Sequence, residues 1–495
     1  MAYFLGIDVS TTATKALLID DSGAVASTHS VEYGLSTPHA LWSEQNPSDW
    51  WTAAVESIRR AMIAASVARD EIEAVGLTGQ MHGLVLLDDR GEVLRPAILW
   101  NDQRAGAQCS QIRERIGTER LIGATGNDAF AGFTAPKLMW VRDHEPDVYE
   151  KIAQVLLPKD YVRYRLTGQY ATDRAGAGGT LLLDLASRDW SPEILEALDI
   201  PLDWLPRTHE GPDITGAIST DAAEETGLAA GTPVVAGGGD QAAQAVGVGA
   251  VEPGVVALTL GTSGVVFTSC DAPTVDTEGR VHAFPHALPD TWHVMGVMLS
   301  AAGSLRWYRD ALGGHADYDQ LLAEAESVRP ASDELFFMPY LSGERTPHAD
   351  PNLRGAFVGL TLQHDRAHLT RSVLEGVAYG LQDNLLLLSR VGVQKPSQVR
   401  ISGGGARGRL WKQILADVMN VELVSVQTEE GAAYGAALLA GVATGAWVSV
   451  VDACEQTIQT TESVTPDATA VSVYQESQAR FQQLYPILRP FYQPS

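Results

Sequence analysis

The residue whose setting best suits acid–base chemistry is Asp240, a carboxylate that follows three glycines at 237–239. The apolar segment before them, PVVA at 233–236, predicts a buried strand, and the glycines leave the carboxylate open to a cleft. Such a group could take a proton from a substrate hydroxyl, as phosphoryl transfer to an alcohol requires. Alternatively, Asp240 caps the helix predicted by the next residues, AAQAVGVG. The two roles are compatible.

Two segments share one design of strand, hydroxyl-rich turn and strand. Residues 3–20 read as YFLGID, VSTTAT and KALLID, and residues 255–268 read as VVALTL, GTSG and VVFT. Each pattern predicts a β-hairpin whose turn is rich in small and hydroxyl residues. Because the second copy begins about halfway along the chain, the pair suggests a duplicated fold.

The two turns offer phosphate chemistry. Asp8, at the end of a strand, could hold Mg²⁺ through waters, because that ion keeps part of its hydration shell. The hydroxyl and N–H groups of the turn could bind phosphate oxygens, and a lysine adds a charge. In the second turn, small residues let the backbone approach a phosphate. The candidates are Thr11, Thr12, Lys15, Gly261 and Thr262. Alternatively, both are ordinary hairpin turns. The matching positions of the two turns in the two halves of the chain nevertheless favour two lobes that bind one triphosphate from both sides.

Three further segments could bind ligands. Gly404 and Gly405 lie in SGGGA, between a predicted strand and a predicted helix, where a ligand could rest on the backbone at the helix N-terminus. Tight strand–helix packing explains the same glycines, and the full dinucleotide fingerprint is absent. Polar loop residues after two other apolar runs could bind sugar hydroxyls, with a methionine against the carbon chain, or could simply be solvated. They are Gln80, Met81, His82, Trp100, Asp102 and Arg104, with Gln241 beside the candidate base.

The elements that must position these residues alternate between strands and helices. Helices are predicted at 47–65 and about 368–389, and strands at 75–77 and 233–239, which indicates an α/β architecture. A chain of 495 residues is too long for one ordinary core, so two large domains are expected, at 1–246 and 247–495.

Composition limits the function classes. The chain has 45% hydrophobic and 19% charged residues, typical of a soluble globular protein. Its formal net charge of −26 argues against a nucleic-acid-binding protein, and any nucleotide site must supply its own local attraction. Three distant cysteines form no metal or disulfide pattern. No apolar run is long enough for a membrane helix, and the N-terminus lacks a signal-peptide pattern, so a cytoplasmic location is expected.

Together these segments resemble the FGGY family of carbohydrate kinases, over essentially the whole chain. Its first signature region is similar to FTAPKLMW at 133–140, and its second to residues 355–375. The resemblance implies a two-lobed actin-like ATPase (ribonuclease H-like) fold, with duplicated mixed sheets, flanking helices and a central cleft. The sugar, the base and the first phosphate turn would belong to the first lobe. The second phosphate turn and the adenosine site would belong to the second.

Within the family the chain is most similar to the xylulokinases, through LWSEQNPSDWW (41–51), GQMHG (79–83), RPAILWNDQR (95–104), LLPKDYVRYRLTG (156–168) and YLSGERTPHADP (340–351). That resemblance implies transfer of phosphate from ATP to D-xylulose, with Mg²⁺, and a possible homodimer. It implies Asp240 as base, Met81 and His82 at the sugar, and Asp8 near the metal. The residues implied at the nucleotide are Thr11, Thr12, Lys15, Thr262, Gly404 and Gly405.

One site position departs from the resemblance, because many xylulokinases have Asn where this chain has Gln241. The longer side chain keeps the same polar groups and moves them by one methylene. A kinase for another ketose or polyol, such as ribulose, a deoxyketose or an alditol, is therefore an alternative. A sugar or nucleotide sensor that performs no transfer is a second one, which the intact Asp240 disfavours.

Overall fold

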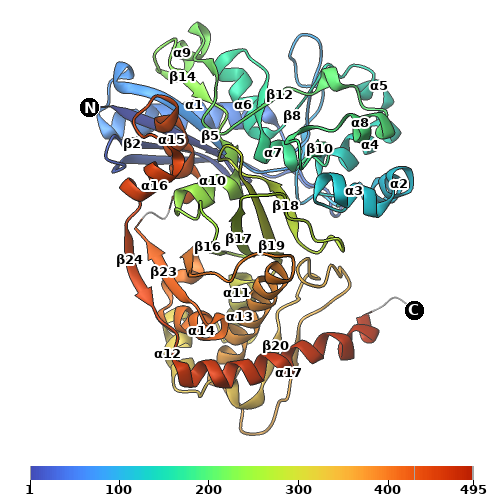
Figure 1. The fold of residues 1–495 in the computed structure, drawn as a ribbon, viewed down its shortest axis with the longest axis vertical. Coiled ribbons are helices and arrows are strands. Elements are labelled where there is room, and N and C mark those ends of the chain that lie inside the picture. Colours follow the sequence, from blue (N-terminus) through green and yellow to red (C-terminus); the bar gives the residue numbers. More distant parts are fainter. Residues whose placement is uncertain (1, 428–429, 493–495) are drawn as a thin grey trace.

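The computed structural model describes residues 2–427 and 430–492, which form two lobes stacked along the long axis of the molecule (Figure 1). The first lobe is built on a seven-stranded sheet in which β15 also pairs with β5. Its strands, in spatial order, are β13 (Ile214–Ala217), β14 (Pro233–Val235), β5 (Ile72–Gly79), β1 (Tyr3–Val9), β2 (Ala13–Asp20) and β3 (Val25–Glu32), with β15 at Gly238–Gly239.

The second lobe is built on another seven-stranded sheet. In spatial order its strands are β18 (His282–Pro285), β19 (Trp292–Met298), β17 (Gly264–Cys270), β16 (Val255–Leu260), β22 (Gln398–Ser402), β23 (Glu422–Val426) and β24 (Thr460–Val464). Short two-stranded pairs complete the strands: β4 (Glu44–Gln45) with β7 (Ala97–Ile98), β6 (Val85–Leu87) with β8 (Gln154–Leu156), β9 (Ala171–Asp173) with β12 (Arg207–His209), β10 (Leu183–Asp184) with β11 (Asp189–Trp190), and β20 (Phe336–Met338) with β21 (Ala356–Val358).

The two sheets repeat one plan. Strand β1 pairs with β2 in antiparallel fashion and with β5 in parallel, and β16 pairs likewise with β17 and β22. The two predicted hairpins are therefore confirmed, and both sheets are mixed, as expected of a two-lobed α/β protein. The predicted strand at 233–239 is interrupted, because Gly237 adopts a positive φ of 72° between β14 and β15.

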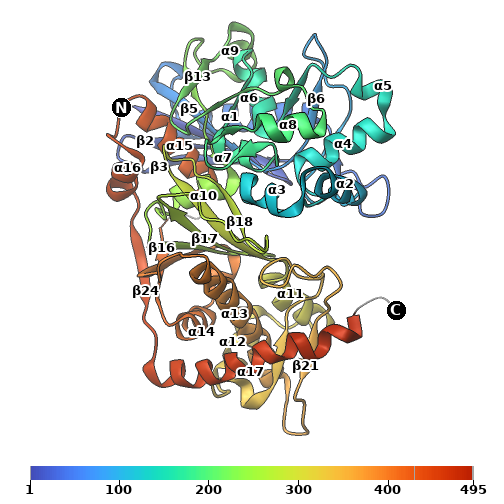
Figure 2. The same cartoon turned by 45° about the vertical axis from the view of Figure 1, so that its right-hand side comes forward.

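Helices cover the sheets on both lobes (Figures 1 and 2). The predicted helices are confirmed as α1 (Pro47–Ala65) and α13 (Arg366–Arg390). No helix among the described residues is long and apolar enough to cross a membrane. The other α-helices are α2 (Gly106–Ile116), α3 (Thr118–Thr125), α4 (Thr134–His144), α5 (Pro146–Tyr149), α6 (Pro158–Thr167), α7 (Arg174–Gly178), α8 (Pro192–Leu198), α9 (Thr220–Thr226), α10 (Asp240–Gly247), α11 (Ala302–Ala311), α12 (Tyr318–Glu326), α14 (Arg409–Met419), α15 (Gly431–Ala443), α16 (Val450–Thr457) and α17 (Ala468–Tyr492).

Helix α15 belongs to the second half of the chain but packs on the first sheet and on α10 (Figure 1). Glycines allow the close approach. A Cβ on Gly6 of β1 would lie 1.9 Å from the Ala433 carbonyl oxygen, and one on Gly435 would lie 2.0 Å from the Ala243 carbonyl oxygen. The helix that begins at Asp240 is thus held against a helix that arrives about 190 residues later in the sequence.

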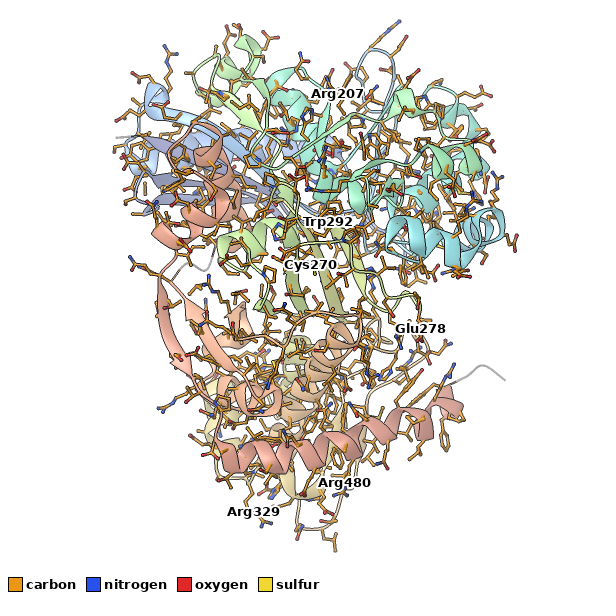
Figure 3. The ribbon with its side chains drawn as sticks, in the orientation of Figure 1. Arg207, Cys270, Glu278, Trp292, Arg329 and Arg480 are labelled. Carbon is orange, nitrogen blue, oxygen red and sulfur yellow. The ribbon has the colours of Figure 1, made fainter. Side chains whose placement is uncertain are left out.

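The lobes also share a buried interface along β18 and β19. Phe284 of β18 packs in one apolar cluster with Phe133 and Leu182 of the first lobe. The Trp292 indole, which Figure 3 shows near the junction of the lobes, donates a 2.7 Å hydrogen bond to the Leu185 carbonyl oxygen. Contacts between the two halves therefore surround the candidate site on more than one side.

Candidate active site

Asp240 is the first residue of α10, directly after the β15 glycines. The N-cap position belongs to Gly239, and no side chain caps this helix, so the alternative in which Asp240 caps it is wrong. As the first helical residue its carboxylate lies at the positive end of the helix dipole. The strand, the glycines and the helix together fix it at the edge of the first sheet.

Asp8 and Asp240 form an electrostatic pair. Burial raises the pKa of Asp240 to about 7, and the charge of Asp8 adds to the effect. Burial likewise raises the pKa of Asp8 to about 6, although Lys15 opposes this. A carboxyl group whose pKa lies near neutral pH is suited to act as a general base.

A buried ion-pair cluster positions the chain before Asp240. The Arg163 guanidinium donates 2.6 Å hydrogen bonds to the carbonyl oxygens of Val235 and Ala236. Asp173 accepts from the Gly239 N–H at 3.3 Å and pairs with Lys159 at 2.6 Å. Buried charges are stable only when paired in this way, so the cluster rigidifies the backbone that carries the base.

Met81 lies against Gly239, and Met81 and His82 both lie against Gly179. The side chain of Met81 is 2.9 Å from where a Cβ on Gly239 would be, and both residues border Gly179. His82 donates from Nδ1 to the Gly179 carbonyl oxygen at 2.6 Å, since a carbonyl can only accept. Burial, above all, lowers the pKa of His82 to about 3, so the neutral ring keeps a lone pair on Nε2. That nitrogen can accept a hydrogen bond from a sugar hydroxyl.

Gln80 connects this segment to the first phosphate turn. Its side chain is only 2% exposed and accepts a 3.2 Å hydrogen bond from the Thr11 hydroxyl. Thr11 in turn accepts from the Trp100 indole at 2.9 Å. Gln45 donates to the Thr11 carbonyl oxygen at 2.6 Å and accepts from Gln80 at 3.2 Å. The turn and the candidate sugar site therefore form one hydrogen-bonded unit.

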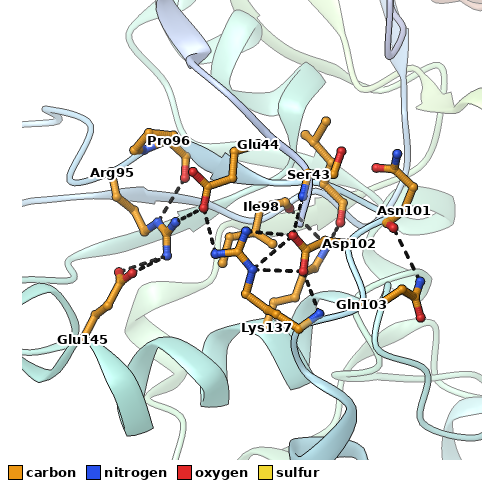
Figure 4. A network of polar contacts seen from close by, with 12 residues as sticks. Ser43, Glu44, Arg95, Pro96, Ile98, Asn101, Asp102, Gln103, Lys137 and Glu145 are labelled. Atoms are coloured by element: carbon orange, nitrogen blue, oxygen red, sulfur yellow. Dashed lines mark hydrogen bonds and ion pairs between the residues drawn. The ribbon is translucent and has the colours of Figure 1, made fainter. Parts of the chain in front are cut away.

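Asp102 is buried within a network of polar contacts (Figure 4), and the side chain of Arg104 is also buried and pairs with protein carboxylates. Arg104 pairs with Asp102 at 2.7 Å and with Glu44 at 2.7 Å, and its guanidinium lies 3.6 Å from the Trp42 ring centroid. Asp102 also accepts from the Ser43 N–H at 2.6 Å. This geometry favours a supporting role, and direct sugar contact by Asp102 or Arg104 stays a prediction.

The remaining residues of the first turn lie near Asp8. Lys15 is its cross-strand partner and forms an ion pair with Glu430, the residue before α15. Thr12 is exposed, and its carbonyl oxygen accepts from the Tyr33 N–H at 3.1 Å. Asp8 Oδ1 is buried with no hydrogen-bond partner among the described residues, which suits a ligand that is not a protein group.

The second lobe contains a cavity of about 560 Å³. Its lining brings together the two predicted glycine segments, because it includes Gly261 and Thr262 as well as Gly404 and Gly405. The N–H groups of Ala301 and Ala302, at the start of α11, donate 2.8 Å hydrogen bonds to the carbonyl oxygens of the 261–262 turn. Leu305, Leu322 and Trp411 contribute apolar walls, which suit a flat aromatic base.

Sequence reasoning missed Gln45, Asp173 and Arg163, which act through other residues rather than on a ligand. Their partners are carbonyl oxygens or amides far away in sequence, so no local pattern marks them. The segments 41–51 and 156–168 do contain Gln45 and Arg163, and their family likeness is the one available signal. No cluster of three or more His, Cys, Asp or Glu side chains with metal-binding geometry occurs among the described residues.

Known sugar kinases are similar to this chain over nearly its full length. A xylulose kinase from Escherichia coli (strain K12) is 43% identical over 98% of this chain and 99% of its own length. A gluconokinase from Bacillus subtilis (strain 168) is 32% identical over 94% of this chain and 92% of its own. The crystal structure of xylulose kinase from Rhodospirillum rubrum superposes with a TM-score of 0.92 at 32% identity, covering 99% of both chains.

Family models account for both lobes. The N-terminal domain of the FGGY family of carbohydrate kinases matches residues 3–247, and its C-terminal domain matches residues 256–444. The two lobes and paired sheets match solved kinases of this type, so the expected actin-like ATPase fold is confirmed. The chain is a sugar kinase and belongs to the FGGY family of carbohydrate kinases.

Proposed function

We propose that the protein transfers the γ-phosphoryl group of ATP to D-xylulose and so forms D-xylulose 5-phosphate and ADP. The observation that carries the proposal is Asp240, whose pKa is raised to about 7 beside Asp8 and beside the segment of Met81 and His82. The xylulose kinases among its relatives support the choice of sugar.

In the proposed reaction the terminal hydroxyl of the ketose lies next to Asp240. The carboxylate takes the hydroxyl proton while the oxygen attacks the γ-phosphorus in line, and the bond to the β–γ bridging oxygen breaks. His82 Nε2 accepts from a sugar hydroxyl, and Met81 covers the carbon chain. Holding both reactants in register lowers the entropic part of the barrier.

The nucleotide would span the two lobes, with its adenosine in the 560 Å³ cavity and its phosphates between the 10–12 and 261–263 turns. Asp8, with its unpartnered oxygen, fits Mg²⁺ that is otherwise coordinated by water and phosphate. When bound, that ion would neutralise phosphate charge, which a protein of net charge −26 otherwise repels.

Three further parts complete the proposal. The site residues of both lobes keep the roles expected from the sequence, with the division between lobes near residue 247. A cytoplasmic location is expected because the substrate ATP is abundant there. A homodimer is expected from the resemblance alone.

The test is a coupled assay for ADP release over D-xylulose, D-ribulose, L-ribulose, 1-deoxy-D-xylulose, xylitol and D-gluconate. D-Gluconate is included because of the gluconokinase relative. We expect D-xylulose to give the highest kcat/KM by at least about tenfold, with a phosphate monoester at O5 by ³¹P NMR. If another acceptor gave a higher kcat/KM, that acceptor would replace D-xylulose in the proposal. If ADP release did not depend on any acceptor, the proposed phosphoryl transfer to a sugar would be wrong.

A further inference from the structure

Arg345, in the second lobe, is held rigidly by its neighbours in the chain. Thr346 donates from its N–H to the Val297 carbonyl oxygen at 3.0 Å, and its hydroxyl accepts from the Val297 N–H at 3.1 Å. Glu344 accepts from the Leu299 N–H at 2.9 Å. These bonds fasten the segment to the end of β19, so the side chain between them starts from a fixed backbone.

The Arg345 guanidinium is largely buried and carries a charge that no carboxylate balances. No described residue forms an ion pair with it within 4.0 Å. Glu344 is the one carboxyl group that acts on its charge, but the two side chains form no ion pair within 4.0 Å among the described residues, and burial raises the pKa of Glu344 to about 8. A buried cation without a partner is costly, which indicates a ligand that the guanidinium serves.

A hydrogen-bonded chain orients Arg345 across the lobe boundary. Asn127 of the first lobe donates from Nδ2 to the carbonyl oxygens of Thr125 and Ala283, so its Oδ1 must accept. His282 Nδ1 therefore donates to that oxygen at 2.8 Å, and its Nε2 accepts from Arg345 at 3.5 Å. Burial keeps the His282 ring neutral by lowering its pKa, which maintains this order of donors and acceptors.

Arg345 lies at the far end of a row of residues that starts at the base. In space, Met81 lies next to Gly239, the residue before Asp240, and His82 comes after Met81 in the row. The next rings are Phe133, 4.6 Å from His82, and His282, 5.7 Å from Phe133, by ring centroids.

Arg345 closes the row over Phe130, at 5.5 Å from its ring centroid. Burial is the main cause of the low His82 pKa, but the charge of Arg345 also contributes, so Arg345 is within electrostatic reach of His82. A ketose whose O5 faces Asp240 would therefore direct its C1–C2 end along this row toward Arg345.

We propose that Arg345 binds the O1 hydroxyl of the ketose from the second lobe and makes the sugar site a product of both lobes. The inference rests on the proposed D-xylulose kinase activity. Five N–H donors in a planar fork suit an oxygen-rich sugar end. Because the residue comes from the opposite lobe, sugar binding would favour the closed arrangement in which base and acceptor meet.

The test combines a variant with a substrate that lacks O1. Arg345→Gln should raise KM for D-xylulose about 10- to 100-fold, the range for a charge-assisted hydrogen bond, with KM for ATP changed less than about twofold. For 1-deoxy-D-xylulose the same variant should change KM, or the inhibition constant, less than about threefold. Arg345→Lys should recover part of the loss, because it keeps the charge but not the fork.

Controls separate this inference from folding and from the proposed function. Arg354→Gln changes an exposed arginine of the same region, and it should leave all constants unchanged. Wild-type turnover of D-xylulose tests the proposed function by itself. If thermal melts show that Arg345→Gln does not fold, the proposed contact is still tested by Arg345→Lys. It is also tested by the wild-type ratio of KM for D-xylulose to KM for 1-deoxy-D-xylulose. Equal losses on both sugars, or an unchanged KM for D-xylulose, would refute the contact with O1.

Discussion

At the scale of single residues, burial decides the chemistry of Asp240. A carboxyl group in water would be ionised at neutral pH and a weak base, whereas burial near the Asp8 carboxylate raises its pKa to about 7. The group is then protonated in about half of the molecules at that pH. It can hold a proton taken from a sugar hydroxyl without becoming a strong acid.

The first prediction concerns that proton. Asp240→Asn should lower kcat by about 10²- to 10⁴-fold, the usual contribution of a general base, and leave weak sugar binding intact. In the wild type kcat/KM should rise with pH up to about 7 and then level off, because only the ionised carboxylate accepts a proton. Steady-state kinetics between pH 5.5 and 8.5 measures both effects.

Thermal stability gives an independent check on the same residue. Because the pKa of Asp240 is raised in the folded protein, the contribution of this group to folding stability is greatest at low pH and is lost as pH rises through 7. Asp240→Asn should therefore raise Tm more at pH 8 than at pH 5. Near-normal turnover in the variant, or a Tm gain independent of pH, would contradict the assignment.

At the scale of elements, two adjacent glycines of one turn, Gly404 and Gly405, have different structural roles. A Cβ on Gly404 would meet no heavy atom within 4 Å and would point into open space at the cavity. One on Gly405 would lie 2.6 Å from Leu260 Cγ. Gly404 therefore leaves room for a ligand, whereas Gly405 permits close packing of the turn on β16.

This difference leads to the second prediction. Gly404→Val should fold normally but fill part of the cavity, and so raise KM for ATP at least about tenfold, equivalent to about 1.4 kcal/mol. KM for the sugar should change less than twofold, because none of the proposed sugar-binding residues lines this cavity. Gly405→Ala should instead lower Tm, since Leu260 must move. A KM for ATP unchanged by Gly404→Val would place the nucleotide elsewhere.

At the scale of the whole molecule, the two halves of the chain are interlocked rather than joined in series. Helix α15 leaves the second sheet and packs on β1, β5 and α10 of the first. Gln244 of α10 donates a 3.1 Å hydrogen bond to the Ser402 hydroxyl of β22. Since α10 begins with Asp240, a relative shift of the lobes reaches the base directly.

The third prediction tests this connection. Gly435→Ala would place a methyl group 2.0 Å from the Ala243 carbonyl oxygen, so α10 and α15 must separate. We expect a loss of about 1–3 kcal/mol in the free energy of unfolding and a lower kcat, because the helix that carries Asp240 moves. Thermal melts and the coupled assay measure both.

The matched control is Gly123→Ala, an exposed helical glycine whose Cβ would meet no atom within 4 Å. It should be neutral or slightly stabilising. If both variants melt and turn over like the wild type, the close contact of α10 and α15 does not position the base.

Local patterns in the sequence determined much of this protein. The two hairpins, helices α1 and α13 and the glycine turns follow from residue periodicity and turn chemistry, which act over a few neighbours. The position of Asp240 after a strand and a glycine run also has a local cause. These features form in any fold that contains the same segments, so they can be predicted from the sequence without knowledge of the fold.

Tertiary structure alone decided the rest, because those properties depend on groups far apart in the chain. The pKa of Asp240 needs burial and the approach of Asp8, and the neutral state of His82 needs its buried surroundings, while the Gly179 carbonyl oxygen fixes which ring nitrogen carries the proton. Arg104 resembles a ligand-binding residue in sequence, yet Glu44 and Asp102 satisfy it. Arg345 lies in the segment 340–351 that carries the family resemblance, but only the meeting of the two lobes brings its charge to His282 and Phe130 in the row of residues that ends at the base.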